Sequence, residues 1–138
     1  ESCTYLAPGV NKQARHTLVT RLAKQKGGEN SMALLPKEIE QQLPPLYANE
    51  EVGLAAQALV KLFTPDSNWT WYASEYDPEH RIAFGYVIGL EDEFGYFSID
   101  ELEEVRGPRG LPIERDEFFK PKSLEEIRKH YRENGYAL

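Results

Sequence analysis

Three turn sequences, spaced about ten residues apart, constrain the fold of this chain more than any other feature. They are rich in proline, aspartate and other polar residues, and occupy residues 65–68, 77–80 and 91–93. Four segments rich in apolar, β-branched or aromatic residues alternate with these turns: residues 58–64, 69–76, 81–90 and 94–98. Because such short connections pair neighbouring strands, the spacing predicts a four-stranded antiparallel meander. Residues 81–90 are apolar almost throughout, which predicts a strand covered on both faces.

Short helices are expected on both sides of this meander. Pro36 is well placed in the first turn of a helix over residues 36–43, and the prolines that follow end that helix. Capping boxes, in which a serine precedes a glutamate by three residues, predict helices over 98–105 and 123–133. Gly135 is expected to stop the last helix. The predicted fold class is α+β: a four-stranded antiparallel meander packed by short helices, with a C-terminal helix.

The charge distribution predicts two parts of the chain. Residues 1–31 have a net charge of +3, whereas residues 32–138 have a net charge of −10. The only methionine, Met32, follows a glycine-containing linker at this point. We therefore expect a basic N-terminal extension over 1–31, either a helical arm or an addition upstream of the natural start, and one acidic α+β domain over 32–138.

This charge balance also limits the partners. A field of negative sign repels phosphate backbones and favours a protein with a basic surface, so nucleic acid is expected to bind only through residues 12–26. No apolar run approaches the length of a membrane span, and residues 1–31 lack the apolar region of a signal peptide, which predicts a cytoplasmic protein. Nothing in the sequence indicates an oligomeric state.

The usual catalytic signatures are missing. The chain contains no phosphate-binding loop, no nucleophile elbow and no zinc-protease helix, and its three histidines lie in unrelated contexts. A single cysteine, Cys3, cannot form an internal disulfide. We therefore predict no catalytic residue, no cofactor and no metal site, and the sequence favours a binding protein over an enzyme.

Two clusters are nevertheless candidates for ligand binding. In the first, strand alternation places Trp69, Trp71 and Glu75 on one face, where the carboxylate could hold a cation or polar ligand over an aromatic platform. The alternative is that the tryptophans belong to the core and Glu75 lies in water at the strand end.

The second cluster surrounds a glycine- and proline-rich loop. It contains Arg106, Glu114, Arg115 and Asp116. An arginine held by a neighbouring carboxylate is oriented to bind a carboxylate or phosphate. The alternative is an ion-pair network that fixes a long loop to the sheet.

Seven further carboxylates are candidates for protein binding. They are Glu91, Asp92, Glu93, Asp100, Glu101, Glu103 and Glu104. We expect them to form a negative patch near one edge of the sheet. Such a patch is either ordinary solvated surface or a surface that imitates DNA phosphates and occupies a basic groove.

Six short sequences carry a resemblance to a known family. They occupy residues 43–47, 63–66, 68–72, 84–85, 95–97 and 111–116. Together they resemble the bacterial domain of unknown function 2958 family over residues 34–122. The resemblance implies a start near Met32 and a small intracellular protein, often encoded on plasmids and integrative elements, sometimes near antirestriction genes. It implies no catalytic residue.

The leading hypothesis is a non-enzymatic acidic accessory protein of a mobile genetic element that binds another protein. Inhibition of a host defence nuclease or another nucleic-acid-binding protein is one form of it, with Trp69, Trp71 or an exposed tyrosine as anchor. The alternative is a small-ligand-binding protein or unrecognised enzyme with a pocket around Glu75, Arg106, Glu114 and Arg115. A third hypothesis has residues 12–26 contacting nucleic acid.

Overall fold

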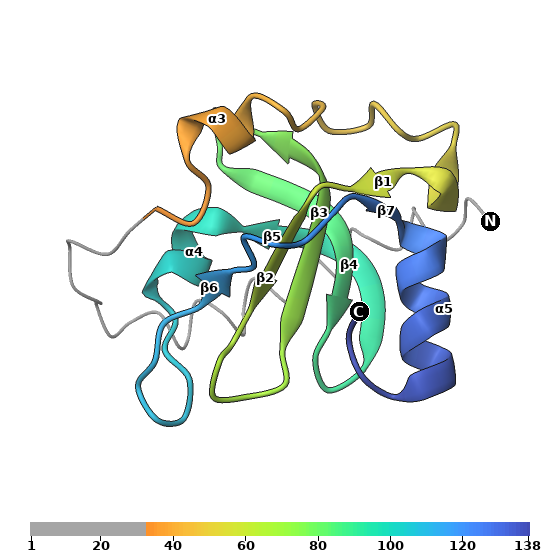
Figure 1. Cartoon of the computed structure of the whole chain (residues 1–138). Helices are drawn as coiled ribbons and strands as arrows, with labels where there is room; N and C mark the ends of the chain where they lie inside the picture. Colours follow the sequence, from red (N-terminus) through yellow and green to blue (C-terminus); the bar gives the residue numbers. More distant parts are fainter. Residues whose placement is uncertain (1–32) are drawn as a thin grey trace.

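An antiparallel sheet organises residues 33–138, the part of the chain that the computed structural model describes (Figure 1). Its five strands have the order β5-β4-β3-β2-β6. They are β2 (Val60–Phe63), β3 (Thr70–Asp77), β4 (Ile82–Ile88), β5 (Asp92–Ser98) and β6 (Glu114–Arg115). The meander predicted from the turn spacing is confirmed, because β2, β3, β4 and β5 are neighbours in sequence order. The predictions for residues 1–31 lie outside the described residues.

The fifth strand was not expected. It is β6, which lies in the segment between the two predicted capping-box helices and pairs with β2 through Leu62↔Arg115 and Phe63↔Glu114. The predicted strand over 58–64 is also divided. Its first residue belongs to β1 (Gln57–Ala58), which pairs with β7 (Lys122–Ser123) in a separate two-stranded sheet. The long segment between α4 (Ile99–Glu104) and α5 (Leu124–Asn134) therefore adds a strand to each sheet.

Short helices occupy the three predicted places, the first over only part of the predicted residues 36–43, and a 3₁₀ turn is found as well. They are α3 (Lys37–Glu40), the 3₁₀ turn η1 (Gly53–Ala55), α4 (Ile99–Glu104) and α5 (Leu124–Asn134). Both capping boxes have formed on their serine side, since Ser98 accepts from the N–H of Glu101 at 3.2 Å and Ser123 accepts from the N–H of Glu126 at 3.0 Å. Gly135 ends α5 with a φ of +82°, in the left-handed region that favours glycine.

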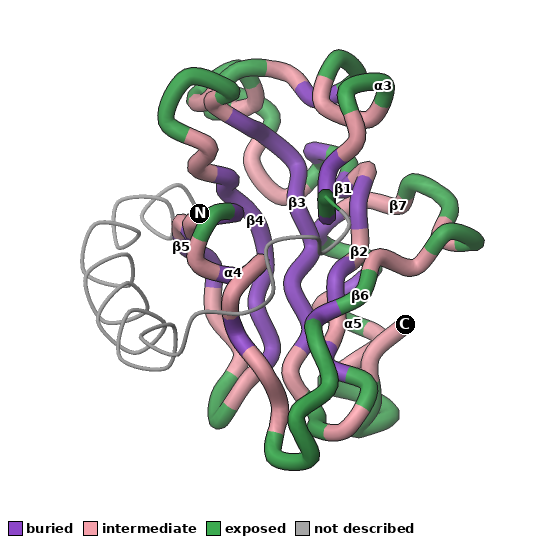
Figure 2. Tube along the Cα trace, turned by 90° about the vertical axis from the view of Figure 1, so that its left-hand side faces the viewer, coloured by how far each residue is buried: buried purple, intermediate pink, exposed green. Residues whose placement is uncertain are grey.

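Apolar side chains cover both faces of the sheet. The first core contains Trp71, Ala73 and Tyr76 of β3, packed with residues of α4 and of the segment around Leu34. The second core contains Tyr72 and Tyr86, packed with Leu124 and Ile127 of α5. Consequently β3 and β4 are buried along most of their length (Figure 2). This burial on both faces explains the apolar composition of residues 81–90.

A β-bulge at Ser74 changes which residues of β3 share a face. Ala73 pairs with Gly85, but Glu75 pairs with Phe84, so one residue of β3 has no counterpart on β4. The alternation is regular up to Ala73 and resumes in the opposite phase after Ser74. For this reason Tyr76 lies in the first core with Trp71, and Glu75 projects from the second face with Tyr72.

The backbones of β3 and β4 approach closely beside this bulge, and only glycine fits there. A Cβ atom on Gly85 would lie 1.7 Å from the carbonyl oxygen of Tyr72. We therefore expect Gly85→Ala to lower the free energy of unfolding by about 1–3 kcal/mol, the usual cost of overpacking. Urea titration followed by circular dichroism measures this loss. Glu79→Ala, in the exposed turn after β3, is the control, and equal midpoints for the two variants would contradict the close approach.

Candidate functional site

The two tryptophans and Glu75 do not form one site. Trp69 and Trp71 stack with 5.8 Å between ring centroids, but Trp71 is buried in the first core. Glu75 projects from the opposite face because of the bulge at Ser74. The prediction that these three residues share a face is therefore wrong, and the reason is the change of phase within β3.

Glu75 is also not in water at a strand end. Its side chain is buried, with a residue exposure of 3%, and both carboxylate oxygens are hydrogen-bonded. Oε1 accepts from the N–H of Tyr47 at 2.8 Å, and Oε2 accepts from the N–H of Asn49 at 2.9 Å. Tyr47 has a φ of +73°, which is rare for a non-glycine residue. The carboxylate thus holds a tight turn of the segment after α3 against the sheet.

The residues of the second cluster separate into two groups. Arg106 donates to the carbonyl oxygens of Glu103 at 3.2 Å and Val105 at 2.9 Å, so its guanidinium caps the end of α4. Glu114, Arg115 and Asp116 lie together along β6. Glu114 pairs with Phe63, which in turn pairs with Thr70 of β3. Glu75 lies five residues farther along β3, about 16 Å from Thr70. The expected pocket around Glu75, Arg106, Glu114 and Arg115 therefore does not form.

The loop before β6 is fixed by a residue that sequence reasoning assigned only to a turn. Asp66, between β2 and β3, accepts from the N–H groups of Arg109 at 2.8 Å and Leu111 at 3.3 Å. Gly107 packs directly against this carboxylate, where a Cβ atom would lie 1.7 Å from Oδ1. Asp116 forms an ion pair with Lys61 of β2 at 3.7 Å. These contacts hold one end of the 107–116 segment to the turn after β2 and the other end to β2 itself.

The seven candidate carboxylates do not form one patch. Glu91, Asp92 and Glu93 lie at one end of β5, whereas the four on α4 follow the other end, about 20 Å away by strand length. Several of them are engaged within the fold, among them Asp92, Asp100 and Glu103. Asp92 accepts from Tyr86 and Arg132, and Asp100 and Glu103 both bind Arg81.

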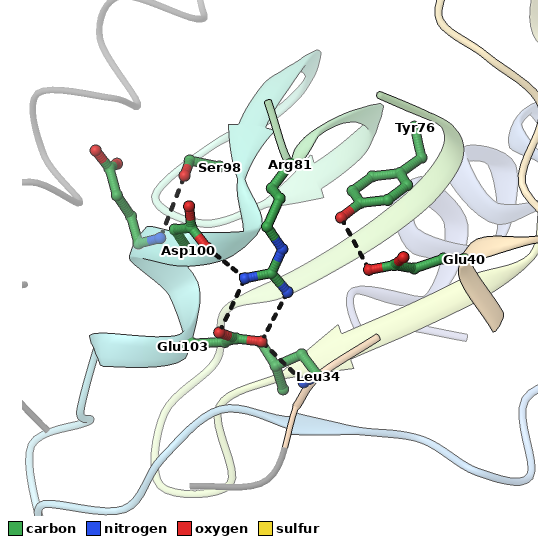
Figure 3. A network of polar contacts seen from close by, with 8 residues as sticks. Leu34, Glu40, Tyr76, Arg81, Ser98, Asp100 and Glu103 are labelled. Carbon is green, nitrogen blue, oxygen red and sulfur yellow. Dashed lines mark hydrogen bonds and ion pairs between the residues drawn. The ribbon is translucent and has the colours of Figure 1, made fainter. Parts of the chain in front are cut away.

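Arg81 is the centre of a network that the sequence did not reveal (Figure 3). Its Nη2 lies 3.1 Å from Glu103 Oε2, and its Nη1 contacts both Glu103 and Asp100. Glu103 also accepts from the N–H of Leu34 at 3.1 Å. Hydrogen bonding with Glu103 is the main reason that the pKa of Arg81 is raised. One guanidinium thus joins the turn after β3 to α4 and to the start of the described residues.

One group of side chains within residues 33–138 could offer three ligand atoms to a metal ion. Asp77, Glu79 and His80 lie in the turn between β3 and β4, with these atoms within 4.8 Å of one another. The carboxylate of Asp77 is already engaged by the His80 ring at 2.7 Å and by the N–H of Glu79 at 3.0 Å. The hydrogen bond from His80 is the main reason that the pKa of Asp77 is lowered. These contacts account for the cluster as part of the turn.

Among the residues that the structure describes, two hollows flank β6, one on each face of the sheet. The Phe63 hollow measures about 400 Å³ and is lined by Lys61, Phe63, Glu114, Arg115, Asp116, Glu117 and Phe118. The Leu34 hollow measures about 340 Å³ and is lined by Ala33, Leu34, Glu103, Pro112, Ile113, Glu114, Arg115 and Glu117. Both combine apolar walls with more carboxylates than cations, an arrangement that suits a side chain with an apolar stem and a positive end.

This surface was only partly predicted. The sequence singled out Glu114, Arg115 and Asp116, and it also included Glu103 in the acidic set. Sequence reasoning missed Leu34, Glu117 and Phe118. Phe118 is 88% exposed, and an aromatic residue beside an acidic run was the one local signal that could have identified it.

Glu75→Gln tests the assignment of the Glu75 carboxylate to the fold. The amide nitrogen cannot accept from a main-chain N–H, so one buried donor loses its partner, and we expect a loss of about 1–3 kcal/mol in unfolding free energy. Urea denaturation measures this loss, with the exposed Glu51→Gln as the control. Wild-type stability in Glu75→Gln would show that the two hydrogen bonds contribute nothing.

Asp92 predicts a pH dependence. Burial alone raises the pKa of its carboxyl, but hydrogen bonds from Tyr86 and Arg132 outweigh burial and hold the pKa below the usual 3.8. A lowered folded pKa contributes stability above the unfolded value, and this stability is lost as pH falls through the folded value. We expect Asp92→Asn to cost about 1 kcal/mol at neutral pH and progressively less below about pH 4. Urea titrations across this range measure the difference. The neighbouring exposed Glu91→Gln is the control, and a cost of Asp92→Asn that does not change with pH would refute the assignment.

Residues 34–135 match the protein family described as "Protein of unknown function (DUF2958)". No curated protein matches the chain significantly, and neither does any solved structure. None of the helices described in residues 33–138 has the length and apolar character needed to cross a membrane.

Proposed function

The chain belongs to the DUF2958 family, and we propose that it is a non-enzymatic binding protein that takes up a basic segment of another protein at β6. The pair of hollows beside β6 carries this proposal. Glu114 and Glu117 line both hollows and are exposed at their rim. A basic side chain placed there would pair with either carboxylate.

The apolar walls of the hollows support a protein partner rather than a free cation. Leu34, Pro112 and Ile113 line one hollow, and Phe63 and Phe118 line the other. Lysine and arginine bury their methylene stems against such walls while the charged end stays at the rim. The exposed ring of Phe118 supplies the kind of aromatic anchor that is enriched at protein interfaces.

The overall charge supports the same class of partner. Residues 32–138 have a net charge of −10, which attracts basic surfaces over long distances and accelerates association. Nucleic acids of like charge are repelled. A nucleic-acid-binding protein has the required basic surface, so inhibition of a host defence nuclease, as part of a mobile genetic element and in the cytoplasm, is the specific form of this proposal.

The site proposed here differs from the patch expected from the sequence. Asp92, Asp100 and Glu103 contribute to internal hydrogen bonds and ion pairs, so their charge is partly neutralised. Glu114 and Glu117 have no such ion pair within the described residues. These two carboxylates are therefore the better choice for testing the proposal.

We expect reversal of both charges, Glu114→Lys with Glu117→Lys, to weaken binding of a basic peptide at least about tenfold. The probe is a fluorescent peptide of about eight alternating lysine and valine residues, titrated with the full chain and followed by anisotropy. Binding to the natural chain should weaken as salt rises, since exposed charges are screened.

Glu50→Lys with Glu51→Lys is the matched control, because both glutamates are exposed and the change in net charge is the same. Equal losses of affinity in the two double variants would show that only the overall charge matters, which would contradict a site at β6. A peptide of alternating glutamate and valine tests the sign, and its tighter binding would contradict the proposal.

A further inference from the structure

The outer edge of β6 has main-chain groups available for another strand. Asp116 donates to the carbonyl oxygen of Lys61 at 2.9 Å, so in the β2–β6 ladder the hydrogen bonds flank the Leu62↔Arg115 pair. In an antiparallel ladder, a residue in such a pair directs its own N–H and C=O away from the partner strand. Within residues 33–138 no hydrogen bond engages the main-chain N–H or C=O of Arg115. Both groups therefore point outward at the sheet edge.

The hollows lie where side chains of an added strand would project. Phe63 and Glu114 are cross-strand partners and project from the second face, towards the Phe63 hollow. Leu62 and Arg115 project from the first face, where Leu34 and Ile113 line the other hollow. Successive side chains of a strand alternate between faces. A strand beside β6 would thus place alternate side chains in the two hollows.

We propose that an extended segment of a partner protein joins the sheet beside β6, with basic residues on one face and apolar residues on the other. This inference rests on the proposed function and specifies how the partner is held. Glu114 and Glu117 line both hollows, and the apolar share of the lining distinguishes the two: the Phe63 hollow is the more polar and receives the basic side chains. The Leu34 hollow has four apolar lining residues and receives the apolar ones.

In strand addition of this kind, the main chain and the side chains make different contributions to binding. The two hydrogen bonds to Arg115 give affinity that does not depend on sequence, and the hollows select the side chains. A second copy of this chain is a poor occupant, because pairing two β6 edges would bring Glu114 and Glu117 of both copies together. The charge of the site therefore favours a different, basic protein.

Proline at position 115 tests the role of the main chain. Arg115→Pro removes the guanidinium and, on the main chain, only an N–H that points away from β2, and proline is tolerated at the open side of an edge strand. Arg115→Ala removes the same charge and keeps the N–H, so it is the matched control. Circular dichroism and urea midpoints establish that both variants are folded. We expect Arg115→Pro to bind the lysine–valine peptide about tenfold more weakly than Arg115→Ala.

A modified peptide provides a second variant that leaves the protein unchanged. N-methylation of alternate residues removes the main-chain donors from one edge of the peptide without altering its charge. We expect the peptide methylated on the bonding edge to lose about tenfold in affinity, while hydrogen exchange of the Arg115 amide slows when the unmodified peptide binds. The Asp116 amide, already bonded to Lys61, is the internal reference.

The outcomes separate the two proposals. Equal affinity for peptides methylated on either edge and for the unmodified peptide, with charge reversal at Glu114 and Glu117 still weakening binding, would overturn strand addition and leave the proposed function standing. Sensitivity to Arg115→Pro without sensitivity to charge reversal would support strand addition and overturn the basic partner. Absence of peptide binding up to about 1 mM would overturn both. Concentration-dependent dimerisation lost in Arg115→Pro would identify a second copy as the occupant and overturn the inference.

Discussion

The change of phase at Ser74 in β3 determines how the rest of the described residues pack. A regular strand would place every second residue of β3 on one face from end to end. Because of the bulge, Trp71 and Tyr76 reach the same core although they are five positions apart. Glu75 projects to the other face and binds the turn at Tyr47 and Asn49. The segment before β1 is held against the sheet through that carboxylate.

The features that the sequence predicted are those decided by neighbouring residues. Turn chemistry fixed the ends of the meander strands, serine caps fixed the starts of α4 and α5, and Gly135 fixed the end of α5, since each signal acts within a few residues. The bulge at Ser74 could not be predicted in this way. Its local sequence alternates as a regular strand does, and the irregularity arises from pairing with Gly85 and Phe84 on another strand.

The same distinction explains what was predicted of the candidate site. Glu114, Arg115 and Asp116 were conspicuous because their charges adjoin a loop rich in glycine and proline. However, β6 pairs with β2, and Leu34 lies beside β6, through contacts between distant parts of the chain. Asp66 has a comparable role, as a turn residue whose carboxylate holds the distant loop before β6. Such long-range contacts cannot be predicted from the periodicity of the sequence.

The network around Arg81 shares Leu34 and Glu103 with one of the hollows beside β6. Leu34 and Glu103 are 69 positions apart, and Arg81 joins both to the turn after β3. A segment bound in this hollow would contact two members of the network. By thermodynamic linkage, such binding would suppress transient opening of α4 and of the first described residues, and would therefore make them more rigid.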